Sequence, residues 1–187
     1  MYKDCKTEQS AIRQRQLEQG LLQAMLAKRY EEISVSDLCD QLEIPRKSFY
    51  RYFSSKDGAL FALLDHTMMD FYHFPFHNLT SVQGTALGDL ERYFLFWSSQ
   101  KPLLEALARS QLSGLLVERA TSLAVSERLM PRRIQGWAAN IQRAAMSFAI
   151  CGLTSMVLQW HAEGYLLTPT QMANIATEML TKPLVGK

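Results

Sequence analysis

The chain has 187 residues, of which 48% are apolar and 20% charged, and its formal net charge is +2. This composition is ordinary for a folded globular protein and excludes a wholly disordered chain. The near-neutral charge also excludes a uniformly basic surface, so any nucleic-acid-binding surface must be local.

The cysteines and the N-terminus indicate a cytoplasmic protein. Cys5, Cys39 and Cys151 lie far apart and form no C-x-x-C pair. This spacing argues against a disulfide framework or a zinc site and favours a reducing compartment. The N-terminal stretch "MYKDCKTEQS" lacks the apolar core of a signal peptide.

Helical periodicity dominates the chain, glycine is sparse and β-branched residues are few, which predicts an all-α fold. Apolar residues share one face over residues 15–30. Ser34, with Asp37 three residues later, approximates a capping box and opens a short helix over 35–42. Pro45 suits the first turn of the next helix.

The second short helix, from about Arg46 to Phe53, is predicted to have two faces. Phe49 and Phe53 fall together, while Lys47 and Arg51 point the opposite way. Two turns of helix are unstable alone, so the phenylalanines must dock this helix on its neighbours. Two short helices joined by a tight turn, the second one basic outward, are typical of a helix-turn-helix motif that enters the DNA major groove.

Cations, a hydroxyl and two phenols on or beside this helix are the expected DNA contacts, because they can reach base acceptors or phosphate oxygens. They are Lys47, Ser48, Tyr50, Arg51, Tyr52 and Lys56. A basic face that is merely solvated is the alternative that this segment alone leaves open. A longer helix, from Lys56 to about residue 74, follows and ends at Pro75.

Residues 10–70 resemble the DNA-binding domain of TetR-type transcriptional regulators. An apolar helix ending in "AKRY" and the stretch "SVSDLCDQLEIPRKSFYRYFSSKDGALFALL" carry the resemblance. It implies a helix-turn-helix at 33–52 with Tyr50 on a phosphate, and it adds Ser34 and Arg46 to the expected DNA contacts.

Three positions depart from the pattern of that family. Glu43 replaces the glycine of the turn, Arg29 replaces the glycine of the first loop, and Pro45 replaces a hydroxyl residue. A non-glycine residue in the turn is strained if its φ is positive. Pro45 removes one potential helix cap.

The remainder is expected to be a second helical domain, so the predicted domains are 1–74 and 75–187. Its helices are predicted near 86–100, 102–110, 113–130, 134–163 and 169–181. The longest uncharged run, 144–162, reaches the length of a membrane span only by including polar residues, so we expect a buried core helix.

The resemblance implies that the C-terminal domain senses a ligand and forms a homodimer. Small residues of the 134–163 helix and one face of the 169–181 helix would suit a four-helix bundle across a two-fold axis. The expected interface residues are Ala145, Ala149, Gly152, Met172, Ile175 and Met179. The alternative is that both apolar stripes are buried inside one subunit.

The resemblance also implies an apolar pocket for a small-molecule effector, for which aromatic residues are the candidate lining. We expect Phe94, Trp97, Phe148 and Trp160 there, with ordinary core packing as the alternative. No cofactor is expected.

A metal site is a rival interpretation, because His66, Asp70, His73 and His77 follow a 4-3-4 spacing, although Pro75 interrupts it. We find no nucleophile elbow, phosphate loop or H-E-x-x-H motif, so an enzyme is not expected. The sequence predicts a DNA-binding transcriptional regulator, a ligand-responsive repressor that binds a palindromic operator as a homodimer. The alternative is a helical metal- or small-molecule-binding protein without DNA binding.

Overall fold

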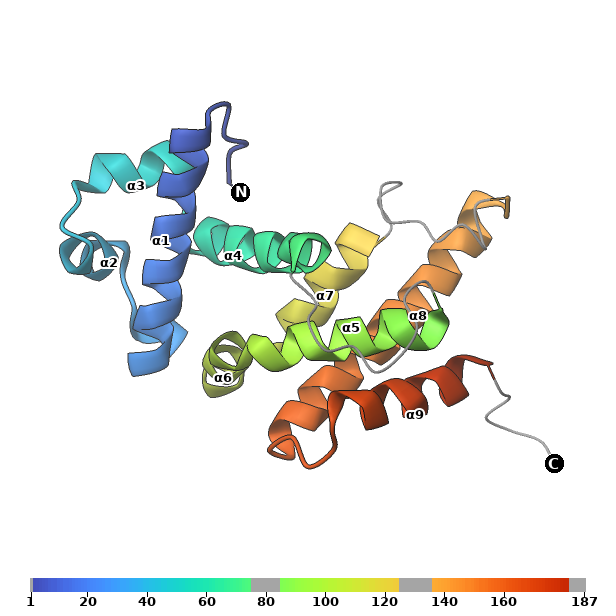
Figure 1. The fold of residues 1–187 in the computed structure, drawn as a ribbon. Coiled ribbons are helices and arrows are strands. Elements are labelled where there is room, and N and C mark those ends of the chain that lie inside the picture. Colours follow the sequence, from blue (N-terminus) through green and yellow to red (C-terminus); the bar gives the residue numbers. More distant parts are fainter. Residues whose placement is uncertain (1, 75–84, 125–135, 182–187) are drawn as a thin grey trace. The chain divides into compact units, whose positions relative to one another are not determined.

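The computed structural model describes residues 2–74, 85–124 and 136–181 (Figure 1). Within these ranges the chain forms α-helices and short 3-10 turns, and the one β-type pairing is an isolated bridge between Tyr2 and Phe53. The predicted all-α fold is therefore confirmed.

The contacts of the chain group it into two compact units. The first contains residues 1–69 and 102–119, and the second contains residues 70–101 and 120–187. This grouping differs from the predicted division after residue 74, because a later segment returns to the first unit. Ser110 Oγ accepts a hydrogen bond from the Tyr30 backbone N–H at 3.0 Å, which connects that segment to the 3-10 turn after the first helix.

Local sequence signals explain the helix starts of the first unit. Thr7 caps α1, Ser34 caps α2 with the predicted capping box, and Ser55 Oγ accepts from the Gly58 N–H at the start of α4. The elements are α1 (Glu8–Ala27), η1 (Tyr30–Glu32), α2 (Val35–Gln41), α3 (Arg46–Tyr52) and α4 (Lys56–Asp70), followed later in the chain by most of α6 (Lys101–Arg109) and the first part of α7 (Ser113–Ala124).

The core of the first unit comes from the apolar faces of α1, α2, α3 and α4. Phe49 and Phe53 are 1% and 0% exposed, and their ring centroids lie 5.2 Å apart. The other fully buried side chains of these helices include Leu21, Met25, Leu38, Leu60, Leu63 and Leu64. The predicted docking of α3 through its two phenylalanines is confirmed.

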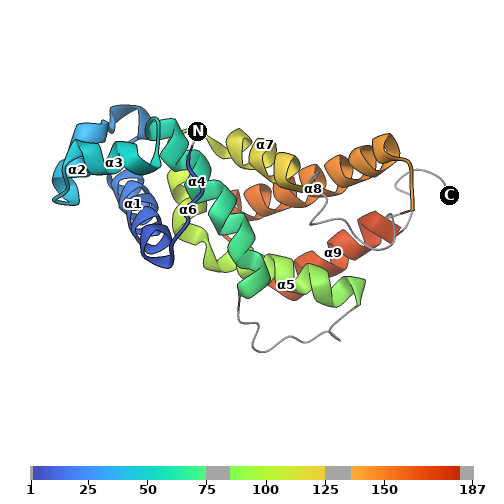
Figure 2. The same cartoon turned by 90° about the horizontal axis from the view of Figure 1, so that it is seen from above.

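The second unit contains η2 (Phe71–His73), α5 (Ala86–Ser99), α8 (Ala139–Ala162) and α9 (Pro169–Thr181). α5 packs along α9, as both views show (Figure 2). Phe94 of α5 meets Trp160 of α8 edge to face, with ring centroids 5.8 Å apart. Thr170 Oγ1 donates to Glu91 Oε1 at 2.7 Å, which links α9 to α5.

The helices described after residue 85 mostly agree with those predicted, but α8 begins at Ala139 and the described residues 136–138 before it are not helical. Parts of the predicted 113–130 and 134–163 helices fall on residues 125–135, which lie outside the described residues.

α8 is not the buried core helix that its composition predicted. It is the one helix among the described residues that is long and apolar enough to cross a membrane by length and composition, yet only 17% of its most apolar stretch is buried. Phe148 is 67% exposed and Ile141 is also exposed. The prediction was wrong because no described element of the chain covers this face of α8.

Candidate nucleic-acid interface

The turn between α2 and α3 is closed by the backbone. The Ile44 N–H donates to Cys39 O at 2.9 Å, and the Glu43 N–H donates to Asp40 O at 3.2 Å. Glu43 has a φ of +52°, a region that favours glycine. The sequence therefore accepts backbone strain at the position where the family pattern has glycine.

α3 exposes a basic face opposite its buried phenylalanines. Arg46, Lys47 and Arg51 are exposed, and Tyr50 is 43% exposed. Ser48 is half-buried on the same short helix. A helix that is anchored by its apolar side and carries cations and a phenol outward has the chemistry to contact phosphates and base edges in a major groove.

Tyr52 differs from the expected DNA contacts because its side chain is only 9% exposed. Its ring lies 6.3 Å from that of Phe53, and its backbone carbonyl accepts a hydrogen bond from the Lys3 N–H at 3.1 Å. A helical projection of α3 could not reveal this, because the N-terminal segment that packs here is distant in sequence. The side chain of Tyr52 is therefore buried in the first unit, and the prediction that it faces outward was wrong.

Lys56 also has a partner within the protein. Its ammonium donates to the carbonyls of Tyr30 and Ile33, both at 2.6 Å, and lies 4.1 Å from the centroid of the Tyr30 ring. The Tyr30 hydroxyl in turn donates to Asp57 Oδ1 at 2.6 Å. Burial and this hydrogen bond raise the pKa of Tyr30. These contacts help to fix the chain that leads into α2, and the expected phosphate contact of the half-buried Lys56 stays a prediction.

Ser34 is exposed at the start of α2, where its hydroxyl oxygen accepts from the Asp37 N–H at 3.1 Å. The Asp37 carboxylate accepts from the Ser34 N–H at 2.9 Å, and hydrogen bonding from Ser34 lowers the pKa of Asp37. The serine that the family pattern places near the DNA backbone therefore also caps the helix.

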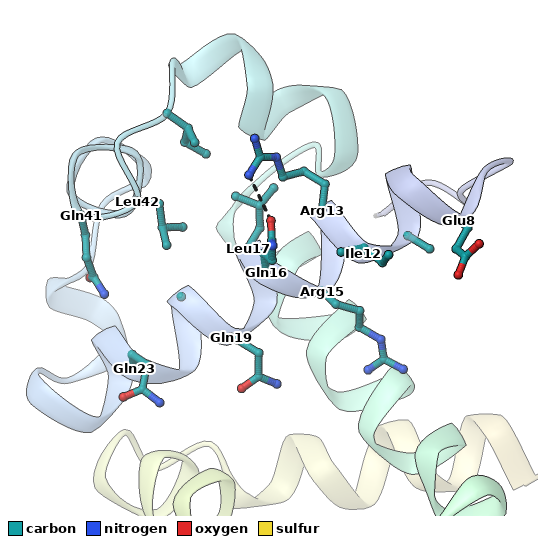
Figure 3. A pocket seen from close by; sticks show the side chains of 13 residues that line it. Glu8, Ile12, Arg13, Arg15, Gln16, Leu17, Gln19, Gln23, Gln41 and Leu42 are labelled. Carbon is teal, nitrogen blue, oxygen red and sulfur yellow. Dashed lines mark hydrogen bonds between the residues drawn. The ribbon is translucent and has the colours of Figure 1, made fainter.

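A groove of about 830 Å³ lies between α1 and the turn after α2 (Figure 3). Leu17 and Leu42 contribute apolar side chains, while Gln16, Gln19 and Gln23 contribute amides at its edge. The groove was not predicted, although Gly20 inside a helix was a signal for close packing. A Cβ atom at Gly20 would lie only 2.6 Å from Leu42 Cδ1.

The predicted dimer residues lie mostly on the exposed side of α8 and α9. Gly152, Ile175 and Met179 are exposed, and Ala145 and Ala149 are half-buried. Met172 differs, because it is buried within the unit. A small groove of about 200 Å³ is lined by Phe148, Ala149, Gly152, Leu153, Met156, Ala176, Met179 and Leu180.

The four predicted pocket residues are not brought together. Phe94, Trp97 and Trp160 are buried in the core of the second unit, and the Trp160 indole N–H donates to Leu167 O at 2.9 Å. Phe148 lies instead on the exposed face of α8. Core packing, which was the alternative, describes the first three residues.

The described residues of the suspected metal site do not gather either. His66 Nδ1 lies 2.9 Å from Glu18 Oε1 on α1, and His77 lies outside the described residues. Among the residues that the structure describes, no group of three His, Cys, Asp or Glu side chains could hold a metal ion.

Comparison with known proteins identifies the fold. No protein-family profile and no curated protein matches the sequence. Among solved structures, the fatty acid degradation regulator FadR from Bacillus halodurans is similar at a TM-score of 0.61 and 16% identity, over 98% of this chain and 100% of FadR. The dihydroxyacetone kinase operon activator DhaS is similar at a TM-score of 0.57 and 13% identity, over 89% of this chain and 93% of DhaS.

A further similar structure is that of the TetR family repressor AlkX from Dietzia sp. strain DQ12-45-1b. Its TM-score is 0.53 at 21% identity, and the match covers 88% of this chain and 90% of AlkX. The match with each of these regulators thus covers most of the chain, including the region of α2 and α3. This chain has the all-α fold of TetR-type transcriptional regulators.

Proposed function

We propose that this protein is a DNA-binding transcriptional regulator whose α3 enters the major groove of an operator. The observation that carries the proposal is the division of α3 into a buried face, Phe49 with Phe53, and an exposed face with Lys47, Tyr50 and Arg51. The fold shared with AlkX and DhaS supports it. We propose that the residues on this face contact the DNA, together with Ser34, Arg46 and Ser48 beside them.

The test is a mobility shift on the DNA upstream of the protein's own coding sequence, repeated over a range of salt concentrations. Lys47→Ala and Arg51→Ala should each weaken binding by about 1–3 kcal/mol if the residue contacts a base. If it contacts only phosphate, the loss should be similar on all sequences and the salt slope should fall by about one.

Arg109→Ala is the matched control for these variants, because Arg109 is an exposed arginine on α6 whose ion pair with Glu105 is long, at 3.8 Å. Its DNA affinity should equal that of the wild type. Wild-type affinity in both α3 variants would refute the proposed interface.

The proposed regulator binds a two-fold operator as a homodimer that associates through α8 and α9. The exposed side chains of Phe148, Ile175 and Met179 support this, because large contiguous apolar surfaces mark interaction sites. A dimer would place two copies of α3 on half-sites about 34–36 Å apart or a multiple of that distance. Sedimentation that shows only monomer at micromolar concentration would contradict it.

An apolar effector of the second unit is the last part of the proposal, and it would release the protein from DNA as a repressor is released. The descriptions of AlkX, implicated in n-alkane biodegradation, and of FadR, a fatty acid degradation regulator, support an apolar ligand class. Calorimetric titration of a medium-chain fatty acid with and without operator tests it, because an inducer must bind more weakly when DNA is present. Equal affinities would exclude that ligand as an inducer.

The cytoplasm is the proposed location of a regulator that binds DNA. All three cysteines are free thiols, which suits a reducing compartment.

A further inference from the structure

The N-terminal segment, residues 2–6, is held alongside the end of α3. The Lys3 backbone N–H donates to Tyr52 O at 3.1 Å, and Tyr2 forms an antiparallel bridge with Phe53. Chain termini are poorly ordered unless something fixes them. The backbone of this segment is therefore fixed next to Tyr52, the residue that follows Arg51 in the chain.

A buried carboxylate anchors the start of the segment. The Tyr2 hydroxyl donates to Asp65 Oδ2 on α4 at 2.8 Å, and the Tyr2 ring meets the His66 ring edge to face at 5.4 Å. Asp65 is almost fully buried and also accepts from Arg119 Nε at 2.8 Å. Burial and the contact with Asp65 raise the pKa of Tyr2, which keeps the hydroxyl protonated as a donor.

A second anchor holds the middle of the segment. The Cys5 thiol donates to Gln14 Oε1 at 2.8 Å, and Gln14 Nε2 donates to Lys3 O at 3.3 Å. Gln14 is itself 2% exposed. Two nearly buried polar side chains, Asp65 and Gln14, are thus used to order a terminus that contributes little to the apolar core.

The anchored segment has three charged side chains, those of Lys3, Asp4 and Lys6, and all three are exposed. Asp4 lies on the side of Arg119, where it lines a pocket of about 470 Å³ together with Tyr2 and Phe61. The segment therefore carries two exposed lysines and is bonded through its backbone to the last residue of α3, while its one acid lines the same pocket as Arg119.

We propose that residues 2–6 form a second DNA-contacting element in which Lys3 and Lys6 neutralise phosphates that flank the site of α3. The inference rests on the proposed DNA binding and deepens it. Anchoring the segment before DNA arrives reduces the conformational entropy that binding would otherwise remove. Each phosphate contact should release counterions and steepen the salt dependence of affinity by about 0.9.

The experiment compares the full-length wild type with a Lys3→Gln/Lys6→Gln variant on the same upstream DNA over a salt series. Affinity should fall about tenfold at low salt, and the slope of log affinity against log salt should fall by about two. An Arg109→Gln variant removes a surface cation elsewhere in the same unit and should keep wild-type affinity and slope. Thermal unfolding should match the wild type in both variants.

Tyr2→Phe tests the anchor without changing the charge of the segment. Asp65 keeps its contact with Arg119, so the fold should persist while the segment loses its fixed position. We expect an affinity loss of about threefold, because a mobile segment must be ordered when it binds.

Wild-type affinity and slope in the lysine variant would overturn this inference, and so would an equal loss in the Arg109 control. The outcome is separable from the proposed function, because Lys47→Ala and Arg51→Ala are measured on the same DNA. If those two lose affinity and the Lys3→Gln/Lys6→Gln variant does not, α3 is the interface and the N-terminal segment is only structural. If none of them loses affinity, the DNA-binding function itself fails.

Discussion

α3 buries its apolar side chains, whereas α8 leaves many of its own exposed. α3 has seven residues, and its phenylalanine Phe49 is buried while its outward side chains are mainly cationic. α8 has 24 residues, and within the part of the chain that the structure describes most of its apolar stretch is not covered. Both helices therefore have an exposed face that internal packing does not explain.

The difference lies in the chemistry that each exposed face offers to a partner. A cationic face with a phenol has the chemistry for phosphates and base edges, whereas an apolar face of small and large side chains suits another protein surface. Length and composition alone would equally allow α8 to cross a membrane. Its partners within the chain, such as Trp160 packed on Phe94, place it instead in a helical unit that has the fold of known regulators.

Truncation of a buried side chain of α3 should have the largest effect on stability among these variants. Phe49→Ala would leave a cavity beside Phe53 and should destabilise the first unit by about 3–5 kcal/mol. Chemical denaturation measures it, with Tyr50→Ala as the control on the exposed side of the same helix. An effect as small as that of the control would mean that α3 is not docked through its phenylalanines.

A bulky residue on the exposed side of α8 should weaken the association of two subunits without destabilising the single subunit. A Cβ atom at Gly152 meets no atom within 4 Å in the subunit, so Gly152→Leu has room there. In the proposed dimer it would be overpacked, which weakens association by about 1–3 kcal/mol. Sedimentation should show more monomer, and affinity for a two-fold operator should fall because the half-sites are no longer bound together.

Gly114→Leu is the matched control, because Gly114 on α7 also has open space around its Cβ position. Its sedimentation should equal that of the wild type. If Gly152→Leu lowers thermal stability at concentrations where the wild type is already monomeric, the exposed face of α8 is used within the subunit and the comparison with α3 fails.

The sequence predicted α3 better than α8 for a physical reason. The two faces of α3 follow from spacing within eight residues, and Phe49 and Phe53 are buried as expected. Tyr52 was misplaced because its side chain is buried although its helical position suggested an outward one, and helical periodicity contains no information about distant segments such as the N-terminal one bonded to its backbone.

The composition of α8 could not decide its burial. A core helix, an interface helix and a membrane span share the same apolar composition, and only the packing of the chain separates them. The internal hydrogen bonds of Lys56 could not be predicted for a similar reason, because its two carbonyl partners come from the segment before α2. Contacts that depend on loop geometry leave no periodic signal.

Removal of the single phenol hydroxyl on the exposed face should have a smaller effect. Tyr50→Phe keeps the ring, which meets that of Phe49 edge to face at 5.6 Å. The loss of a hydrogen bond to phosphate should reduce DNA affinity by about 0.5–1.5 kcal/mol, while thermal stability should stay unchanged. Lower stability with full DNA affinity would mean that the Tyr50 hydroxyl is structural.

A substitution in the turn between α2 and α3 should have the smallest effect, a small gain in stability. Glu43 adopts a φ of +52°, so Glu43→Gly should relieve backbone strain and stabilise the first unit by about 0.5–1 kcal/mol, after the greater flexibility of glycine in the unfolded chain is counted. Glu43→Ala is the control, because it removes the same charge and keeps the Cβ atom. We expect denaturation to show a gain for glycine only. An equal gain over the wild type in the glycine and alanine variants would mean that the carboxylate, and not the backbone of the turn, determines the stability at this position.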